Sequence, residues 1–356
     1  MSKIETLWYT RCPVPTPLGI AAQLGWIEDE FRCDGIKVRT LQDEADPKLR
    51  ASHFDHKLDN SFRQGGNIPA IWARSSGRET RVVGLTWTDE AQVILTAPDR
   101  NIHTVADLKG KRLGVATRPN DPIDFWKATT LRAYLAALKL HGLSEEDVDL
   151  IELPRAEASS VGQGWGDEPL VESVEARALA RGDVDVIFHK GSRGLELADA
   201  IGAYIVYDVG AHPDPRVRVN NGSPRTLTVD AGLLERDRSL VVRLVKQVLR
   251  AGRWAEEHRA EALTYVAKET RSSESAVERA YGREVNRHLH TDLVESSIVA
   301  LGDFTHFLAK WRFIPRDFDV RSWIDFRPLR QAQQELSAEV HSEEREGASA
   351  VVASVA

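Results

Sequence analysis

Short apolar runs alternate along the chain with longer stretches in which apolar residues recur every three or four positions. The short runs predict buried strands, and the longer stretches predict amphipathic helices. We expect strands at residues 7–10, 36–41, 81–86, 92–96, 111–116, 148–153, 184–188, 204–207 and 226–229. We expect helices at residues 18–31, from residue 67, and at 123–141, 173–181, 239–258, 260–269, 273–281 and 292–310. This alternation is typical of βαβ units around a mainly parallel sheet, so we predict an α/β fold.

The length of the chain predicts two lobes. A single hydrophobic core stops growing at roughly 250–300 residues, and this chain has 356. The βα pattern restarts near residue 100, so we assign residues 91–204 to a second lobe. Residues 1–90 and 205–335 should form a discontinuous first lobe, because the C-terminal helices need a sheet to cover. We expect a ligand cleft between the lobes and a poorly ordered tail over residues 336–356.

Composition and charge limit the classes of partner. Apolar residues make up 42% of the chain and charged residues 28%, which is ordinary for a globular protein. The net charge is −7, from 47 basic and 54 acidic residues, which excludes general nucleic-acid binding. A bound anion must therefore be held by local positive charge. No apolar run reaches the ~20 residues that cross a bilayer, and the N-terminus lacks the apolar segment of a secretory signal. We expect a cytoplasmic monomer with no membrane partner.

Cys12 is the first candidate for chemistry. It follows the first predicted strand, and ligands of open α/β sheets bind at the carboxyl ends of strands. It also precedes a predicted helix, and a thiol at a helix N-terminus reacts as a thiolate. Pro13 and Pro15 stiffen the turn that holds it. Two interpretations stay open: Cys12 is a nucleophile, or it is a small buried apolar residue. Cys33 is expected to be structural. Two cysteines make no disulfide framework, and a single bridge between Cys12 and Cys33 stays open.

A glycine pair marks a second candidate. Arg63, Gly65 and Gly66 lie at the end of a polar stretch, residues 42–65, that we expect to be an irregular loop. Glycine lets a ligand approach the backbone closely. The helix that follows, with Asn67 as its expected N-cap, directs free N–H groups toward them. A guanidinium also matches an oxyanion with two hydrogen bonds. We predict an anion site here; the alternative is a tight turn with a surface arginine.

Histidine and tryptophan supply the remaining candidates. A histidine near a thiol can deprotonate or orient it, so His53 is a candidate partner of Cys12. Taken alone, a histidine in a polar loop is more often a solvated residue. His53, Asp55 and His56 do not match the common zinc spacings, so we predict no metal. Trp126 stands near the start of a second-lobe helix, where it would line a closing cleft or pack in the core. No Walker or dinucleotide glycine motif occurs, and no cofactor is predicted.

Three segments resemble the 2′-hydroxybiphenyl-2-sulfinate desulfinases. They are Cys12-Pro13-Val14-Pro15 with the residues before it, His53-Phe54, and Arg63-Gln64-Gly65-Gly66-Asn67-Ile68-Pro69. The resemblance continues more thinly over residues 107–115, 182–185 and 254–258. Those segments recur across the type II periplasmic-binding-protein fold, which includes sulfonate, taurine and nitrate binders.

The resemblance implies a two-lobed, type II periplasmic-binding-protein-like fold and assigns roles. Cys12 is the catalytic thiol, His53 is its partner, and Arg63 with Gly66 is the sulfinate cradle. The chain departs from that family at Arg11, over residues 42–52 and over residues 117–125. These departures flank the expected pocket and leave the organic part of the substrate open.

The expected function is cysteine-dependent hydrolysis of an organic, aromatic sulfinate to the desulfinated product and sulfite. Cys12 attacks sulfur in one route, and in the other it delivers a proton to the carbon that bears sulfur. One alternative is a non-catalytic sulfonate or oxyanion solute-binding protein of an ABC transporter, which has no use for Cys12. Another is a cytoplasmic enzyme of the same fold, similar to thiamine-pyrimidine synthases. If the protein is a desulfinase, its expected partner is a small anionic organosulfur substrate.

Overall fold

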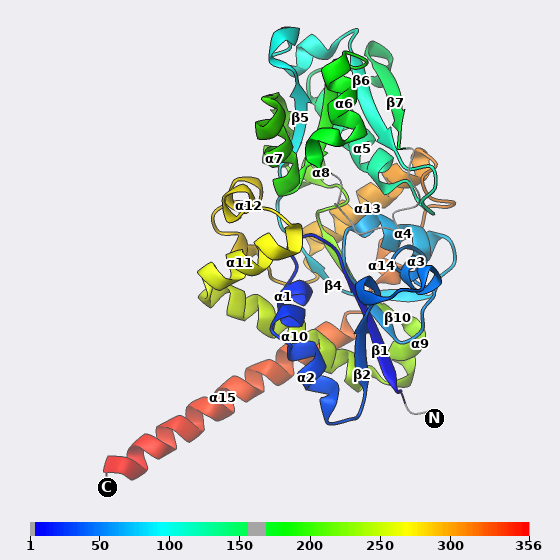
Figure 1. Cartoon of the computed structure of the whole chain (residues 1–356). Coiled ribbons are helices and arrows are strands. Elements are labelled where there is room, and N and C mark those ends of the chain that lie inside the picture. The colour runs from blue at the N-terminus through cyan, green and yellow to red at the C-terminus, as the bar shows by residue number, and fades with distance from the viewer. Residues whose placement is uncertain (1–3, 156–168, 356) are drawn as a thin grey trace.

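The structure, a computed structural model, describes residues 4–155 and 169–355 and contains two five-stranded sheets (Figure 1). The first sheet has the order β2-β1-β3-β10-β4 and the second β7-β6-β8-β5-β9. The strands of the first sheet are β1 (Thr6–Arg11), β2 (Lys37–Thr40), β3 (Ser61–Gly65), β4 (Thr80–Thr86) and β10 (Arg225–Asp230). Those of the second are β5 (Gln92–Thr96), β6 (Arg112–Thr117), β7 (Asp149–Pro154), β8 (Val186–Lys190) and β9 (Tyr204–Asp208). The predicted two-lobed α/β architecture is confirmed.

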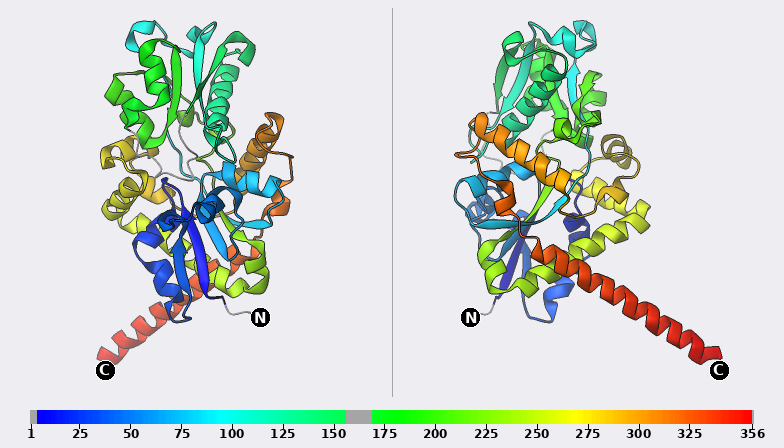
Figure 2. Two further views of the ribbon diagram at one scale, coloured as in Figure 1. Left: turned by 45° about the vertical axis from the view of Figure 1, so that its right-hand side comes forward. Right: turned by 180° about the vertical axis from the view of Figure 1, so that it is seen from behind.

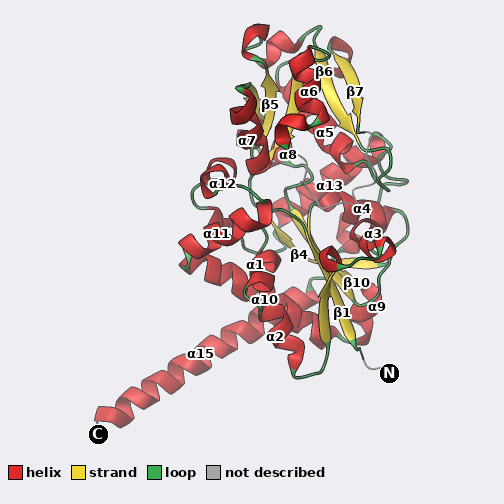
Figure 3. Ribbon diagram, viewed as in Figure 1, coloured by secondary structure: helices red, strands yellow, loops and turns green. Residues whose placement is uncertain are grey.

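Helices cover both faces of each sheet (Figure 3). In the first half of the chain they are α1 (Pro17–Gln23), α2 (Trp26–Arg32), α3 (Pro47–Asp55), α4 (Asn67–Ser75), α5 (Phe125–Leu140) and α6 (Val174–Arg181). In the second half they are α7 (Gly191–Ile201), α8 (Pro215–Arg218), α9 (Ala231–Arg236), α10 (Arg238–Glu257), α11 (Arg259–Thr270), α12 (Glu274–Tyr281), α13 (Glu295–Lys310), α14 (Val320–Trp323) and α15 (Arg327–Val355). Short 3-10 turns connect several of them.

Two apolar clusters lie on opposite faces of the first sheet. Leu7 and Phe62 pack with Leu244 of α10 on one face, and all three are 2% exposed or less. Phe54 and Phe304 pack against Val82 on the other face. Because both faces are buried, the strands of this sheet are held in a fixed register.

The stretch from residue 42 to residue 65 is not the irregular loop that we predicted. It contains α3, which Asp46 caps by accepting a hydrogen bond from Lys48 N at 2.8 Å, and β3. β3 pairs in parallel with β1 and antiparallel with β10, so it lies in the middle of the sheet. The prediction failed because Arg63 and Gln64 place polar side chains in a strand that is almost completely buried. The helix expected over 18–31 is likewise divided, since Gly25 adopts φ +77° between α1 and α2.

The chain passes between the sheets at residues 87–91 and again at residues 209–224. The expected lobe boundary at residue 205 falls inside β9, which pairs with β5 in the second sheet. The return to the first sheet therefore begins after Asp208. The division of the chain into lobes otherwise stays a prediction, and it agrees with the membership of the two sheets.

The poorly ordered tail expected over residues 336–356 stays a prediction; α15 continues to Val355 and extends away from the two lobes (Figure 2). Glu335 and Glu339 on this helix pair with Lys246, and Glu339 also pairs with Arg250. The segment is rich in alanine and glutamate, which favour helix even where few tertiary contacts are made.

Candidate functional site

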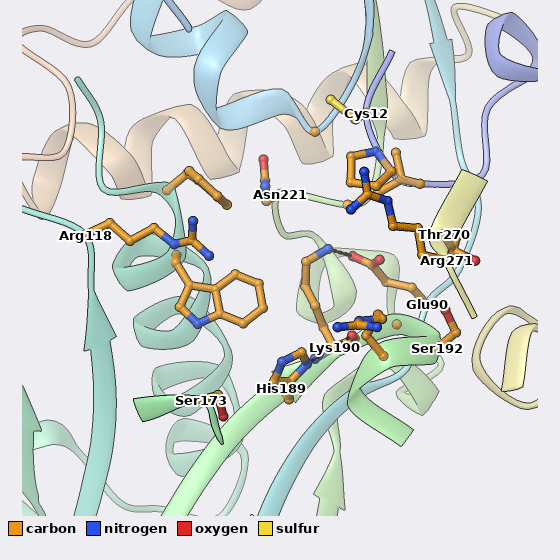
Figure 4. Close-up of a pocket in the computed structure, with 18 of the residues that line it drawn as sticks. Cys12, Glu90, Arg118, Ser173, His189, Lys190, Ser192, Asn221, Thr270 and Arg271 are labelled. Atoms are coloured by element: carbon orange, nitrogen blue, oxygen red, sulfur yellow. Dashed lines mark hydrogen bonds and ion pairs between the residues drawn. The ribbon is translucent and has the colours of Figure 1, made fainter. Parts of the chain in front are cut away.

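A cavity of about 260 Å³ lies between the two sheets, and residues of both lobes line it (Figure 4). Of the residues that we predicted, Cys12, His53, Arg63, Gly66 and Trp126 line this pocket. Gly65 does not. The tertiary structure therefore brings together side chains that are more than 110 positions apart in the sequence.

Cys12 is buried at the end of β1, with 6% of its surface exposed. We expected Cys12 at the N-terminus of α1, but the N-cap of that helix is Thr16, which accepts a hydrogen bond from Gly19 N at 3.0 Å. The β1–β3 register pairs Arg11 with Gln64, which brings Cys12 beside Gly65. A Cβ at Gly65 would overlap Cys12 Sγ. Gly65 therefore makes room for the thiol and is not itself part of the pocket wall.

Arg63 supplies positive charge at this thiol. Its Nη2 lies 3.2 Å from Cys12 Sγ, and its Nη1 donates to Gly66 O at 2.7 Å. The side chain is 2% exposed, and burial lowers the pKa of its guanidinium while Cys12 opposes that shift. Two fixed contacts and a rigid strand therefore hold one guanidinium edge beside the sulfur.

The start of α4 is capped by Asn221, from the second segment that joins the two sheets. Asn67 N donates to Asn221 O at 2.9 Å, and Ile68 N donates to Asn221 Oδ1 at 3.0 Å. Our expectation that this helix start offers its free N–H groups to an anion is wrong for these two groups. Asn67 is also the first residue of the helix, and Gly66 is its N-cap.

Asn221 is the residue of this cluster that the sequence analysis missed. Because Oδ1 accepts from Ile68 N, Nδ2 is the group of the side-chain amide that remains for another partner, and Figure 4 shows the side chain turned into the pocket. A Cβ at Gly66 would lie 2.6 Å from Asn221 Oδ1, so a glycine is required there. The run Asn220-Asn221-Gly222 indicates a turn in the sequence, but not its contact with residue 66.

His53 is buried on α3 and is 7% exposed. Its Nδ1 lies 3.1 Å from Thr10 Oγ1, which accepts a hydrogen bond from Gln42 Nε2 at 3.0 Å. Burial lowers the pKa of His53 well below its ordinary value, and the charges of Arg63 and His56 lower it further. His56 is buried nearby, and burial lowers its pKa well below the ordinary value, as do the charges of Arg63 and Arg78. Both rings are therefore neutral at neutral pH.

Trp126 stands in the first turn of α5 and forms part of the opposite wall. Its indole N–H donates to Glu175 Oε1 at 2.8 Å, and its ring centre lies 5.1 Å from that of His189. The Arg118 guanidinium lies 5.9 Å from the indole ring centre. These contacts fix the orientation of the indole.

Lys190 and Glu90 form a second polar cluster that the sequence analysis did not find. Lys190 Nζ lies 2.7 Å from Glu90 Oε1, and Arg225 Nη2 lies 3.5 Å from Glu90 Oε2. Glu90 is 3% exposed, and both Lys190 and Glu90 line the pocket. Isolated lysines and glutamates carry no sequence signal for burial, because they are usually on the surface.

Within residues 4–155 and 169–355, no group of three or more His, Cys, Asp or Glu side chains is arranged to hold a metal ion. The described helices also include none that is long and apolar enough to cross a membrane.

The close contact between Gly65 and Cys12 gives a first prediction. Gly65→Ala should lower the free energy of unfolding by about 1–3 kcal/mol, the usual cost of overpacking, and should alter the alkylation rate of Cys12. Gly302→Ala is the matched control, because a Cβ there meets nothing within 4 Å in the interior of α13. It should be neutral or stabilising by up to ~1 kcal/mol. Urea unfolding and iodoacetamide kinetics measure both effects, and equal stabilities for the two variants would contradict the packing described.

The two buried histidines predict a pH dependence of stability. Below the ordinary histidine pKa of 6.5, the unfolded chain binds protons on both rings and the folded chain does not. The free energy of unfolding should therefore decrease as the pH is lowered. The loss should be about 1 kcal/mol for each histidine between about pH 7 and pH 5.5.

Urea unfolding of a His53→Gln/His56→Gln double variant tests this dependence, since the fall with pH should become shallower. His288→Gln with His290→Gln removes two exposed rings and is the control. A slope for the His53/His56 variant that is no shallower than that of the control would show that these rings are not the cause.

Known proteins resemble the chain over most of its length. It is 28% identical over 348 residues to a protein of Rhodococcus erythropolis named 2′-hydroxybiphenyl-2-sulfinate desulfinase, covering 90% of this chain and 91% of the relative. A solved cysteine-to-serine mutant of DszB, in complex with biphenyl-2-sulfinic acid, is 25% identical and superimposes with a TM-score of 0.78. The match covers 93% of this chain and 99% of the DszB chain.

The fold is shared more widely. The periplasmic aliphatic sulphonate binding protein SsuA of Escherichia coli is 17% identical, with a TM-score of 0.65 over 90% of this chain and 92% of its own. This likeness confirms the two-lobed, type II periplasmic-binding-protein-like fold that the sequence resemblance implied. The family model described as "NMT1/THI5 like" matches residues 13–262 of the 356. The chain therefore belongs to the NMT1/THI5-like family.

Proposed function

We propose that the protein is an enzyme that cleaves a carbon–sulfur bond, hydrolysing an organic sulfinate to the desulfinated product and sulfite. The observation that carries this proposal is the guanidinium of Arg63, 3.2 Å from the Cys12 thiol inside a pocket where both side chains are almost completely buried. The similarity to the Rhodococcus protein and to DszB supports it.

The sulfinate group is held by Arg63, Gly66 and Asn221. A sulfinate carries one negative charge over two oxygens, each of which accepts hydrogen bonds. Each Nη of Arg63 has a second proton beyond those given to Gly66 O and Cys12 Sγ, and Asn221 Nδ2 adds a neutral donor. Donors fixed in a site that excludes water stabilise developing charge without reorganising.

Cys12 performs the reaction by one of two routes. In the first, its thiolate attacks sulfur, the carbon–sulfur bond breaks, the carbon takes up a proton, and water then releases sulfite from sulfur. In the second, the thiol gives its proton to the carbon as sulfur dioxide leaves; water adds to the sulfur dioxide, and one of its protons returns to Cys12. Both routes add one water to the sulfinate and yield R–H and hydrogen sulfite.

His53 sets the protonation state of Cys12 in this proposal. Thr10 Oγ1 lies 3.1 Å from His53 Nδ1 and accepts a hydrogen bond from Gln42 Nε2, so this contact fixes the orientation of the imidazole. Nε2 lies at the edge of the ring opposite Thr10. Because burial lowers the pKa of His53 well below its ordinary value, the ring is neutral at neutral pH and acts as a weak base toward the thiol.

The organic part of the substrate is aromatic in this proposal. Trp126 and Phe125 present aromatic side chains to the pocket, and Val14, Pro69 and Leu170 add apolar surface. The contacts of the indole with Glu175 and His189 hold Trp126 in a fixed position against which a flat ring can pack.

Binding of a sulfonate without catalysis is the second candidate function. The likeness to SsuA favours it, as does a 36% identity over 102 residues, or 28% of this chain, to a putative aliphatic sulfonates-binding protein of Bacillus subtilis (strain 168). Such a protein would use the anion cradle and not the thiol. Activity that depends on Cys12 therefore separates the two candidates.

Cys12→Ser should abolish sulfite release and retain binding of benzenesulfonate. A hydroxyl is a much weaker nucleophile and acid than a thiol at neutral pH, so we expect a loss of at least about a hundredfold in kcat. Cys33→Ser is the matched control, because Cys33 is the other cysteine and is exposed. Sulfite release that survives Cys12→Ser at near wild-type rate would remove the mechanism.

Arg63→Ala should weaken binding of benzenesulfonate by about 1.5–3 kcal/mol, the range for hydrogen bonds to charged groups. Calorimetry measures the dissociation constant, and circular dichroism checks that the variant is folded. Arg216→Ala is the control, because it removes the same charge from an exposed position. A folded Arg63→Ala protein with an unchanged dissociation constant would show that the anion binds elsewhere.

A further inference from the structure

A second cavity, of about 10 Å³, lies between the first sheet and α3. Its walls include residues of β1, β3 and β10, together with Ser52 and His56 at the end of α3. Among the described residues, Arg63 is the one that lines both this cavity and the larger pocket. A ligand of the small cavity would therefore contact the residue that we assign to the anion.

Two buried polar atoms of the residues at this cavity lack a partner. Arg63 is 2% exposed and His56 is 5% exposed. Neither Arg63 Nε nor His56 Nε2 makes a hydrogen bond to any of the described residues. A buried polar group without a partner destabilises the fold, because it loses its hydrogen bonds to water. One ligand that bonds to both atoms would satisfy both.

The backbone contacts of His56 fix the place of its ring. His56 N donates to Ser52 O at 3.0 Å, and His56 O accepts a hydrogen bond from Arg78 Nε. Because burial lowers the pKa of His56, the ring is neutral at neutral pH, with one donor and one acceptor nitrogen. Arg63 Nε can only donate. A ligand between them must therefore accept from the guanidinium and suit a neutral imidazole.

One water molecule meets these requirements. A cavity of about 10 Å³ has room for one water, and a buried water typically makes about three hydrogen bonds. It would accept from Arg63 Nε and donate to His56 Nε2. Its other proton suits the hydroxyl of Thr228, which also lines the cavity and donates to Arg63 O at 3.4 Å. The positive charge of Arg63 disfavours a metal cation in the same place.

We propose that one buried water joins Arg63 Nε to His56 Nε2, and that His56 is thereby a positioning residue for the anion site. Its role at that site rests on the proposed function. Gly66 O and Cys12 Sγ hold the two Nη atoms of Arg63, and the water holds the Nε edge. Three contacts fix the plane of the guanidinium, so its remaining Nη protons keep one direction toward the ligand.

A crystal structure of the unliganded protein, at a resolution that shows ordered water, tests the water itself. A water should lie within about 3.2 Å of both Arg63 Nε and His56 Nε2. The structure of a His56→Phe variant should lack it. A wild-type structure without this water, or with a direct contact between the two side chains, would overturn the inference.

Calorimetry with benzenesulfonate tests the positioning role without requiring activity. His56→Phe should weaken binding about fivefold, which is within the net contribution of one hydrogen bond. His56→Gln should stay within about twofold of the wild-type affinity, because its side-chain amide can bond to the same water. His288→Phe is the control, since it makes the same change at an exposed histidine, and it should leave the affinity unchanged.

An Arg63→Lys background separates this role from a general structural effect. Lysine has no N–H group equivalent to Nε, so the water has no cation to hold there. In this background His56→Phe should change the dissociation constant by less than about twofold. Equal losses in the two backgrounds would show that His56 does not act through Arg63 and would overturn the positioning role.

Sulfite release from benzenesulfinate keeps this inference distinct from the proposed function. If the water and the coupling between His56 and Arg63 are found but no sulfite is released, only the proposed function is contradicted. If sulfite is released but the water or the coupling is missing, only the present inference is contradicted.

Discussion

A guanidinium and a thiol lie 3.2 Å apart at the carboxyl end of the first sheet, and the register of two parallel strands fixes both. Burying an arginine is costly unless its N–H groups find acceptors. Arg63 has Gly66 O and Cys12 Sγ, but its buried Nε has no hydrogen-bond partner among the described residues. The guanidinium is therefore short of acceptors, and in our proposals an oxyanion in the pocket and one buried water supply them.

Both glycines near this contact act by leaving space. At Gly65 the space is filled by Cys12, and at Gly66 by the amide of Asn221. Asn221 lies 153 positions from Ile68, whose N–H it accepts, so the segment that returns the chain to the first sheet also completes the start of α4. One asparagine thereby joins the first lobe to the segment between the sheets and presents its remaining amide group to the ligand.

The positive charge beside the thiol contrasts with the net charge of −7 of the whole chain. Arg63 is almost completely buried, and low-dielectric surroundings strengthen its attraction for an anion. The buried histidines contribute no charge to this field at neutral pH, because burial lowers the pKa of each. In our proposals, Arg63 anchors the substrate and His53 exchanges protons.

The sequence alone determined the α/β class, the two lobes and most of the strands, and it singled out Cys12, His53 and Arg63, which line one pocket. These features have local signals: apolar periodicity, chain length, and short motifs shared with a known family. Only the tertiary structure decided that Arg63 stands on a central strand, that Gly65 supports the thiol from outside the pocket, and that Asn221 occupies the start of α4. It also placed Lys190 and Glu90 in the opposite wall. The reason is physical: a polar side chain becomes buried because of what it pairs with, and its partner can be 153 residues away, whereas a sequence pattern records only its neighbours.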